Sequence, residues 1–430
     1  MFIMLKKTLT IFSVLVISLF FLSFYGWVVK EISVNKQKYG FITEPIKFMY
    51  TFPDMFKQSV EEVKKLPGTF VKTPKNFKPI NKLDQDVYAL FSYSESDKVR
   101  AIIVKNLRND SVVRKWTIAN NHANIARIIH AMLLPDGSLV YGYAYKWSGI
   151  KRIDTAGNVI WEQKNAVFHH SKEFDKDGNI WASTAKTNGM TTGMYKLHKQ
   201  TVFYHDQTIT KIDAETGKIL FNKSVSEILK ENNLEYYLLK SPDVIDPLHL
   251  NDVEPALKTT EYYEEGDVFM SFRHISAIIH YRPSTNKVIN VIEGPFVSQH
   301  DVDFLNDHTI AVFNNNNYVR RAGKHTRKPP KDTSALTIVG DFYSNIVTYD
   351  FRDESYSFIG DSIFRANKIF TYTEGLFEFI DDSTYFVEEQ NSGVMWVIRD
   401  NEVIYKNVLK SQHEGYHHLL NWTRIIKNYD

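Results

Sequence analysis

The chain begins with one long apolar segment and continues as many short ones. No charged residue occurs over residues 8–29. A helix of that length is about 33 Å long, enough to cross a bilayer core of roughly 30 Å. The pattern predicts a membrane anchor at residues 1–30. A cleaved secretory signal is the alternative, although Phe24, Tyr25 and Trp27 leave little room for a small-residue cleavage site.

Lysines near this segment set the expected orientation. Lys6 and Lys7 precede it and favour a cytoplasmic N-terminus by the positive-inside tendency, although further lysines follow it. We therefore expect a single-pass protein of the inner (cytoplasmic) membrane whose bulk faces the periplasm or the exterior.

Residues 31–95 carry repeated prolines and are interpreted as a connecting region. Apolar residues recur at helical spacing only over residues 53–66, which predicts one short helix there. This pattern is typical of either a membrane-proximal spacer or an edge packed on the main domain.

From about residue 86 the chain changes to short runs rich in Val, Ile, Tyr, Phe and Thr, separated by Gly, Asn and Asp. This is the pattern of strands and hairpins. One type of hairpin recurs six times, at residues 102–116, 150–162, 209–221, 278–291, 346–359 and 396–405. A second type of hairpin lies between some of these copies. Two hairpins per repeat predict an all-β fold, a six-bladed β-propeller over residues 96–430, rather than a β-sandwich or a β-helix.

Composition narrows the chemistry. Lys and Arg number 52 and Asp and Glu 50, so a nucleic-acid partner is not indicated. The absence of cysteine excludes disulfides, thiol nucleophiles and Cys-ligated metals. No glycine-rich phosphate loop or G-x-S-x-G elbow occurs. A nucleophile or metal ligand must then come from histidine, carboxylate or hydroxyl groups.

Two histidines take equivalent places in the second type of hairpin. His170 and His300 each lie seven residues before the turn aspartates Asp177 and Asp307. Because this strand of a propeller blade starts near the central channel, we expect both imidazoles to project toward one axial site. His130 is shifted by one position relative to its turn, so it is expected to point the other way.

Besides His170 and His300, a further group of polar residues lies in residues 243–257 and includes His249 and Asn251. This stretch is too polar for an ordinary inner strand. Arg273 follows within an apolar run. A guanidinium is costly to bury without a partner, so this residue indicates either a structural ion pair or an anion-binding site.

Four segments, taken in order, resemble the signature segments of the bacterial arylsulfate sulfotransferase family. They are HHSKEFDKDGNIW, DPLHLNDVEP, SFRHISAIIHY and QHDVDFLNDHTIAVFNN, and the resemblance covers roughly residues 100–425, including the closing segment HHLLNWTRI. It implies a six-bladed propeller that moves a sulfuryl group from an aryl sulfate to a phenolic acceptor by a ping-pong route. No nucleotide sulfate donor and no cofactor are implied.

The resemblance also assigns roles to residues. The covalent sulfohistidine of the family corresponds to His300. The positions that would contact the sulfate are His170, with His169 as the competing register, His249, Asn251 and Arg273. A neutral imidazole is a competent nucleophile, and His249 or His170 can act as general acid/base.

Two carboxylates, Glu254 and Asp301, are candidates for fixing imidazole tautomers, or are solvated carboxylates. The chain departs from better-studied members in lacking a disulfide and a separate N-terminal β-domain. A glycan, a lipid or a peptide tyrosine therefore stays open as the acceptor beside small phenols.

Two readings from other classes stay open. His170, His249 and His300 are also able to hold a Zn²⁺ or Mn²⁺ ion for lyase or hydrolase chemistry. A propeller can alternatively bind a glycan or a partner protein without catalysis. The sequence does not define the oligomeric state.

Overall fold

A computed structural model describes residues 2–33, 39–64, 66, 68–144, 149–185, 192–318, 337 and 339–427. The chain divides into two compact units, Met1–Leu66 and Pro67–Asp430, and each is described by itself.

The first unit is helical. It consists of α1 (Phe2–Ser33), the 3-10 turn η1 (Gly40–Ile42) and α2 (Thr43–Lys64). The stretch Lys7–Ile32 of α1 is long and apolar enough to cross a membrane, as predicted. The helix predicted over residues 53–66 was wrong in its start. Pro53 lies inside α2, because a proline costs a helix one backbone hydrogen bond but does not always end it.

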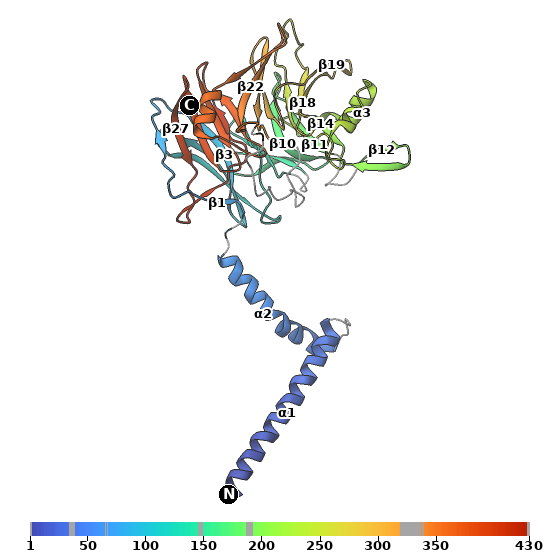
Figure 1. Cartoon of the computed structure of the whole chain (residues 1–430), viewed down its shortest axis with the longest axis vertical. Helices are drawn as coiled ribbons and strands as arrows, with labels where there is room; N and C mark the ends of the chain where they lie inside the picture. The colour runs from blue at the N-terminus through green and yellow to red at the C-terminus, as the bar shows by residue number, and fades with distance from the viewer. Residues whose placement is uncertain are drawn as a thin grey trace. The chain divides into compact units, whose positions relative to one another are not determined.

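The second unit contains six sheets of one plan, which confirms the six-bladed β-propeller (Figure 1). Each sheet is antiparallel, and most consist of strands consecutive in the chain. In hydrogen-bonded order the sheets are β29 (Arg424–Ile426), β3 (Tyr88–Ser96), β4 (Val99–Asn106) and β5 (Val112–Ala119); β6 (Met132–Leu133), β7 (Leu139–Gly142), β8 (Ile150–Ile153) and β9 (Val159–Gln163); β10 (Val167–Phe174), β11 (Ile180–Ala185), β14 (Gln207–Ile212) and β15 (Ile219–Ser224); β16 (Leu250–Pro255), β17 (Val268–Phe272), β18 (Ala277–Arg282) and β19 (Lys287–Ile292); β20 (His300–Asn306), β21 (Thr309–Asn314), β22 (Asn345–Asp350) and β23 (Ser355–Ile359); and β24 (Leu376–Phe379), β25 (Thr384–Glu389), β26 (Val394–Arg399), β27 (Glu402–Val408) and β2 (Ile80–Asn81).

The ring is closed by both ends of this unit. Strand β29 from the C-terminal end pairs with β3, and β2 from the N-terminal end pairs with β27. A third pairing joins β1 (Phe70–Lys72) to β28 (Tyr416–His418). The segment predicted as connecting region thus supplies three strands to the second unit. Such overlap removes the free sheet edges that an open ring would leave.

The core lies between neighbouring sheets, where apolar side chains of adjacent blades interdigitate. Between the β6 and β10 sheets, for example, Met132, Ile150 and Trp161 pack with Phe168 and Ile180. This packing fixes the angle between blades and hence where the first strands of the sheets face each other. Strands β10, β16 and β20 contact one another in turn, so they line the axis.

Side chains on the first strands also tie each blade to the next. Ser171 accepts a hydrogen bond from the backbone N–H of Val253 at 3.1 Å, and Asp252 accepts one from Val302 at 2.6 Å. In the same way, Asp301 accepts a hydrogen bond from the backbone N–H of Phe377, and Glu378 accepts one from that of Ile425. We call these four residues the inter-blade belt.

Smaller elements are inserted between the blade strands. The hairpin of β12 (Gly193–Leu197) and β13 (Gln200–Tyr204) projects from the β10 sheet (Figure 1). Three helices occupy connections: α3 (Val225–Glu231), α4 (Tyr237–Lys240) and α5 (Asp361–Asn367). Ser224 caps α3, because its hydroxyl oxygen accepts the Glu227 N–H at 3.1 Å.

Candidate active site

Three imidazoles from three blades meet at the axis. The ring centroid of His170 lies 5.2 Å from that of His249 and 6.0 Å from that of His300. His170 belongs to β10, His249 immediately precedes β16, and His300 begins β20. We call these residues the histidine cluster. His170 and His300 are buried, whereas the side chain of His249 is 19% exposed.

A bulge at the start of each first strand presents these side chains. The pairing registers shift between Phe168 and Lys172 in β10 and between His300 and Val302 in β20. His170 and His249 have left-handed backbones, with φ of 53° for both, whereas in β20 the left-handed residue is Asp301. By backbone conformation, His170 therefore corresponds to Asp301, one residue after the His300 that the sequence predicted as its equivalent. Left-handed non-glycine residues are strained and concentrate at functional sites.

One tautomer of His300 is fixed by its surroundings. The amide nitrogen of Asn315 donates to the carbonyl oxygens of Thr371 and Glu374, at 3.0 and 2.7 Å. Its oxygen therefore faces His300 and accepts the ring Nδ1–H at 2.6 Å. The backbone N–H of Glu374 lies 3.3 Å from Nε2, so that nitrogen carries the lone pair.

The electrostatics keep His300 neutral. Burial, and then the positive charge of Arg273, hold the pKa of His300 well below its usual range. Burial likewise lowers the pKa of His170 far below normal, with the neighbouring His169 adding to the effect. A neutral imidazole with a free lone pair is the form that attacks an electrophile.

His249 has a carboxylate partner that the sequence did not suggest. Its Nδ1 donates to Asp246 Oδ2 at 2.5 Å, and its ring stacks on His274 at a centroid distance of 4.5 Å. The Nδ1 of His274 in turn donates to the backbone oxygen of Asp246 at 2.5 Å. Burial raises the pKa of the Asp246 carboxyl, but the interactions with His249 lower it by more. The net pKa lies below the usual value, so Asp246 is ionised.

The remaining predicted residues adjoin the cluster in different ways. His169 is buried, and its Nδ1 lies 2.9 Å from that of His170, which is the one of the two that contacts His249 and His300. Arg273 is buried directly after β17, and its backbone N–H donates to the His249 carbonyl at 3.1 Å. Asn251 is buried too and donates through Nδ2 to the Gln299 carbonyl at 2.7 Å.

Three further residues complete the surroundings. Arg127 and Glu374 form a bidentate ion pair, with contacts of 2.6 and 3.2 Å, beside His300. The ring of Trp422 packs beside those of His170 and His300, with centroid distances of 5.9 and 6.3 Å. A sequence signal existed only for Trp422, which lies in the closing segment HHLLNWTRI.

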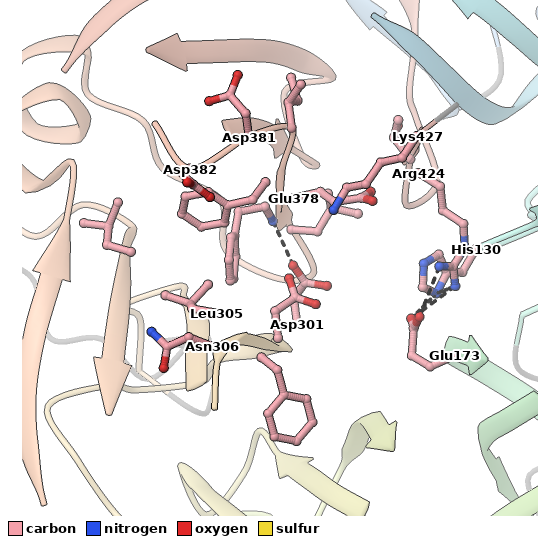
Figure 2. A pocket seen from close by; sticks show the side chains of 18 residues that line it. His130, Glu173, Asp301, Leu305, Asn306, Glu378, Asp381, Asp382, Arg424 and Lys427 are labelled. Carbon is pink, nitrogen blue, oxygen red and sulfur yellow. Dashed lines mark hydrogen bonds and ion pairs between the residues drawn. The ribbon is translucent and has the colours of Figure 1, made fainter. Parts of the chain in front are cut away.

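Farther along the same strands the channel wall is rich in carboxylates. A cavity of about 740 Å³ lies here. Its lining includes Glu173, Asp301 and Glu378, together with Arg424 and His130 (Figure 2). The ring centroid of His130 lies 5.2 Å from that of Trp422, and its Nδ1 accepts the Lys172 backbone N–H at 3.1 Å. We call this region the carboxylate end.

The two predicted tautomer-fixing carboxylates belong to this end. Asp301 Oδ2 accepts the backbone N–H of Phe377 at 2.8 Å instead of an imidazole N–H (Figure 2). Burial, followed by the charges of Glu173 and Asp303, raises the pKa of Glu254 well above normal. Instead, Asn315 and Asp246, which both lie in connections outside the strands, accept the Nδ1–H groups of His300 and His249.

Within the described residues, one group of side chains comes close enough to hold a metal ion: Asp246, His249 and His274. It shares only His249 with the predicted metal trio. The Asp246 and His249 atoms lie 2.5 Å apart. Two ligands of a tetrahedral zinc ion with bonds near 2.0 Å are about 3.3 Å apart. The group therefore has the geometry of a hydrogen-bonded dyad.

One solved structure shares the fold, and a second shows a weaker likeness. A protein of unknown function from Bacteroides caccae is 10% identical with a TM-score of 0.50, covering 80% of this chain and 100% of its own. A catalytically inactive virginiamycin B lyase from Staphylococcus aureus, solved with quinupristin, is 11% identical with a TM-score of 0.39, covering 79% and 89%.

None of the curated proteins matches this chain. The family model described as Arylsulfotransferase (ASST) matches residues 130–406, which is more than half of the chain. The match begins at His130 and spans the histidine cluster, Arg273 and Asn315. This chain therefore belongs to the arylsulfotransferase family.

Proposed function

We propose that this protein transfers a sulfuryl group from an aryl sulfate ester to a phenolic acceptor through a covalent sulfohistidine on His300. Family membership supports aryl sulfotransferase activity in general. The observation that carries the covalent route is the hydrogen bond from His300 Nδ1 to Asn315, which leaves the lone pair on Nε2. A nucleophilic Nε2 needs this lone pair, and burial together with the charge of Arg273 keeps the ring unprotonated by holding the pKa of His300 well below its usual range.

In the first half-reaction, His300 Nε2 exchanges its long hydrogen bond with Glu374 for a bond to sulfur. The S–O bond to the aryl group breaks, and its electron pair leaves on the phenolate oxygen. His249, held by the ionised Asp246, supplies the proton that this oxygen needs. The products are a phenol and an N-sulfated His300.

In the second half-reaction the acceptor phenol enters. Its oxygen attacks sulfur as His249 takes its proton, and the N–S bond electrons return to His300. The acceptor leaves as a sulfate ester, and the enzyme is restored without any co-reactant. His170 lies between the other two rings and contacts the sulfuryl oxygens.

Negative charge on the sulfuryl oxygens is stabilised by groups placed in advance. Arg273 offers a planar fork that matches two anionic oxygens. Nδ2 of Asn251 gives one hydrogen to the Gln299 carbonyl, and its second hydrogen is a neutral donor. Buried donors of this kind stabilise the transition state because they need no reorganisation.

The test is incubation with p-nitrophenyl sulfate and phenol. We expect the wild type to release p-nitrophenol and, without acceptor, to gain the mass of one sulfuryl group. His300→Ala should lose both, with turnover reduced at least about 10³-fold. His198→Ala, which alters an exposed histidine in the turn of the β12–β13 hairpin, serves as the matched control. Wild-type turnover by His300→Ala would refute the nucleophile assignment.

A second candidate function rests on the Asp246, His249 and His274 group. If these residues held a divalent ion, it would act as a Lewis acid in lyase or hydrolase chemistry. Elemental analysis of the active protein separates the two functions. We expect turnover to survive chelation, and stoichiometric metal with activity lost on chelation would favour the second.

The cellular setting is part of the proposal. Helix α1 anchors the protein in the inner membrane as a single pass, and the catalytic unit faces the periplasm or exterior. Small aryl sulfates and phenols are then the partners that reach the channel. Carbonate extraction of membranes and protease accessibility of residues beyond α1 test the anchor and the side.

A further inference from the structure

Helix α2 carries an apolar surface that the described residues leave uncovered. Phe48, Met49 and Phe52 are 56%, 60% and 50% exposed, and Phe41 in the preceding turn is 92% exposed. The rings of Phe48 and Phe52 lie 5.7 Å apart. We call these four residues the α2 apolar face. Large apolar side chains gathered in this way mark a contact surface.

Polar residues border this face. At 100° per residue, positions 48, 49 and 52 lie within about 100° of one another, whereas Lys47 points about 145° away from their mean direction, and Glu44, one turn before Phe48, lies at the edge of the face. Glu44 and Lys47 form an exposed ion pair at 3.8 Å. An amphipathic helix of this kind is suited to lie in the plane of a membrane interface.

The length of chain between the two helices favours a lipid occupant. Helix α1 ends at Ser33 and η1 begins at Gly40, so residues 34–39 alone separate them. Six residues reach at most about 20 Å when fully extended. The ring of Tyr39 lies 6.5 Å from that of Trp27 near the end of α1. If α1 crosses a bilayer, the α2 apolar face begins at the surface of that bilayer.

We propose that α2 lies in the membrane interface at the C-terminal end of α1, with Phe41, Phe48, Met49 and Phe52 inserted among the acyl chains. This inference rests on the anchoring role proposed for α1, and it is independent of the chemistry in the propeller. Burial of the α2 apolar face in lipid removes it from water, while Lys47 stays at the headgroups.

The chain has no cysteine, so single cysteines can carry a spin label in the full-length protein. The variants Phe48→Cys and Lys47→Cys place labels on the two sides of α2, and Ile17→Cys places one in the middle of α1. In phosphatidylcholine nanodiscs we expect the Phe48 label, like the Ile17 label, to be accessible to oxygen and shielded from a water-soluble nickel complex. The Lys47 label should show the reverse.

Three outcomes would overturn the proposal, and they differ. Equal nickel access at Phe48 and Lys47, with Ile17 shielded, would mean that α2 stays in water although α1 is inserted. Disulfide-linked dimers of unlabelled Phe48→Cys would mean that a second copy covers the face. Nickel access at Ile17 would remove the anchor itself, and the activity assay with p-nitrophenyl sulfate would remain unaffected by any of these results.

Discussion

The two ends of the propeller channel are built on the same three strands but carry different groups. On each strand a carboxylate follows the clustered histidine by three residues, in the pairs His170 and Glu173, His249 and Asp252, and His300 and Asp303. A three-residue step along a regular strand would place the two side chains on opposite faces. The bulge between them adds one residue and brings both toward the axis.

Burial acts on the two ends with opposite sign. It disfavours the charged form of either group, so it lowers the pKa of His170 and His300 and raises that of Asp252 to about 7. At the histidine end the result is that His170 and His300 are neutral, as the proposed mechanism requires. At the carboxylate end it is a set of acceptors for backbone N–H groups. Desolvation therefore keeps the buried imidazoles neutral at one end and the buried carboxyls protonated at the other.

The sign of the pH dependence follows from these shifts. Buried neutral imidazoles contribute stability that is present above their unfolded pKa of about 6.5 and is lost as the pH falls. Protonated buried carboxyls contribute stability that is present below about pH 4 and is lost as the pH rises through their folded pKa. The histidine end is therefore vulnerable to acid and the carboxylate end to alkali.

The largest expected effect separates two arginines. We expect Arg273→Ala to lower kcat by about 10³-fold, because it removes a preorganised charge from the transition state. Arg424→Ala should instead lower the free energy of unfolding by about 3 kcal/mol, since it leaves Glu173 without its ion-pair partner at 3.1 Å. Turnover of p-nitrophenyl sulfate and urea unfolding of both variants measure the difference.

The conservative variant Arg273→Lys sharpens this test. It keeps the charge but not the planar fork, so it should recover only part of kcat. If Arg424→Ala lost as much activity as Arg273→Ala at unchanged stability, the two ends would not differ in role.

A smaller effect is expected from Asp246→Asn. The amide still accepts a hydrogen bond from His249 but no longer stabilises its protonated form, so kcat should fall about 30-fold while KM for p-nitrophenyl sulfate changes little. Asp246→Glu should retain more activity than Asp246→Asn. The control is Asp382→Asn, an exposed carboxylate at the other end of the channel. A rise in KM at constant kcat would show that Asp246 shapes substrate binding only.

The sequence was sufficient to predict the propeller. Each outer hairpin has apolar strands and a polar turn of its own, and these local signals recur six times along the chain. The ring closure was not predictable in this way. β1, β2 and β29 are two or three residues long. Their partners lie at the opposite end of the unit, so no local pattern marks them.

The candidate site was predictable only where its residues occupy repeated strands. His170, His249 and His300 lie at or near the start of the first strands of successive blades, and the ring of His170 lies within 5.2 and 6.0 Å of the other two ring centroids. Asn315 and Asp246 lie in connecting loops, where no repeat fixes their position. Their partners are set by how one blade packs on the next, which only the folded ring determines.

The smallest expected effect concerns Glu378 of the inter-blade belt. Burial raises the pKa of Glu378 to about 7, so its proton is lost as the pH rises and the folded state is weakened. Glu378→Gln keeps an acceptor for the Ile425 N–H, which lies 2.6 Å from Oε2, but cannot ionise. Between about pH 6 and about pH 8 the wild type should lose about 1 kcal/mol more unfolding free energy than the variant, measured by urea titration.

Glu414→Gln, at an exposed turn, should behave as the wild type. Activity should be unchanged in both, because this carboxyl acts on the backbone of the next blade and not on the substrate. A pH slope identical to wild type in Glu378→Gln would show that the carboxylate end is hydrated and already ionised, and the contrast between the two ends would then reduce to the histidines alone.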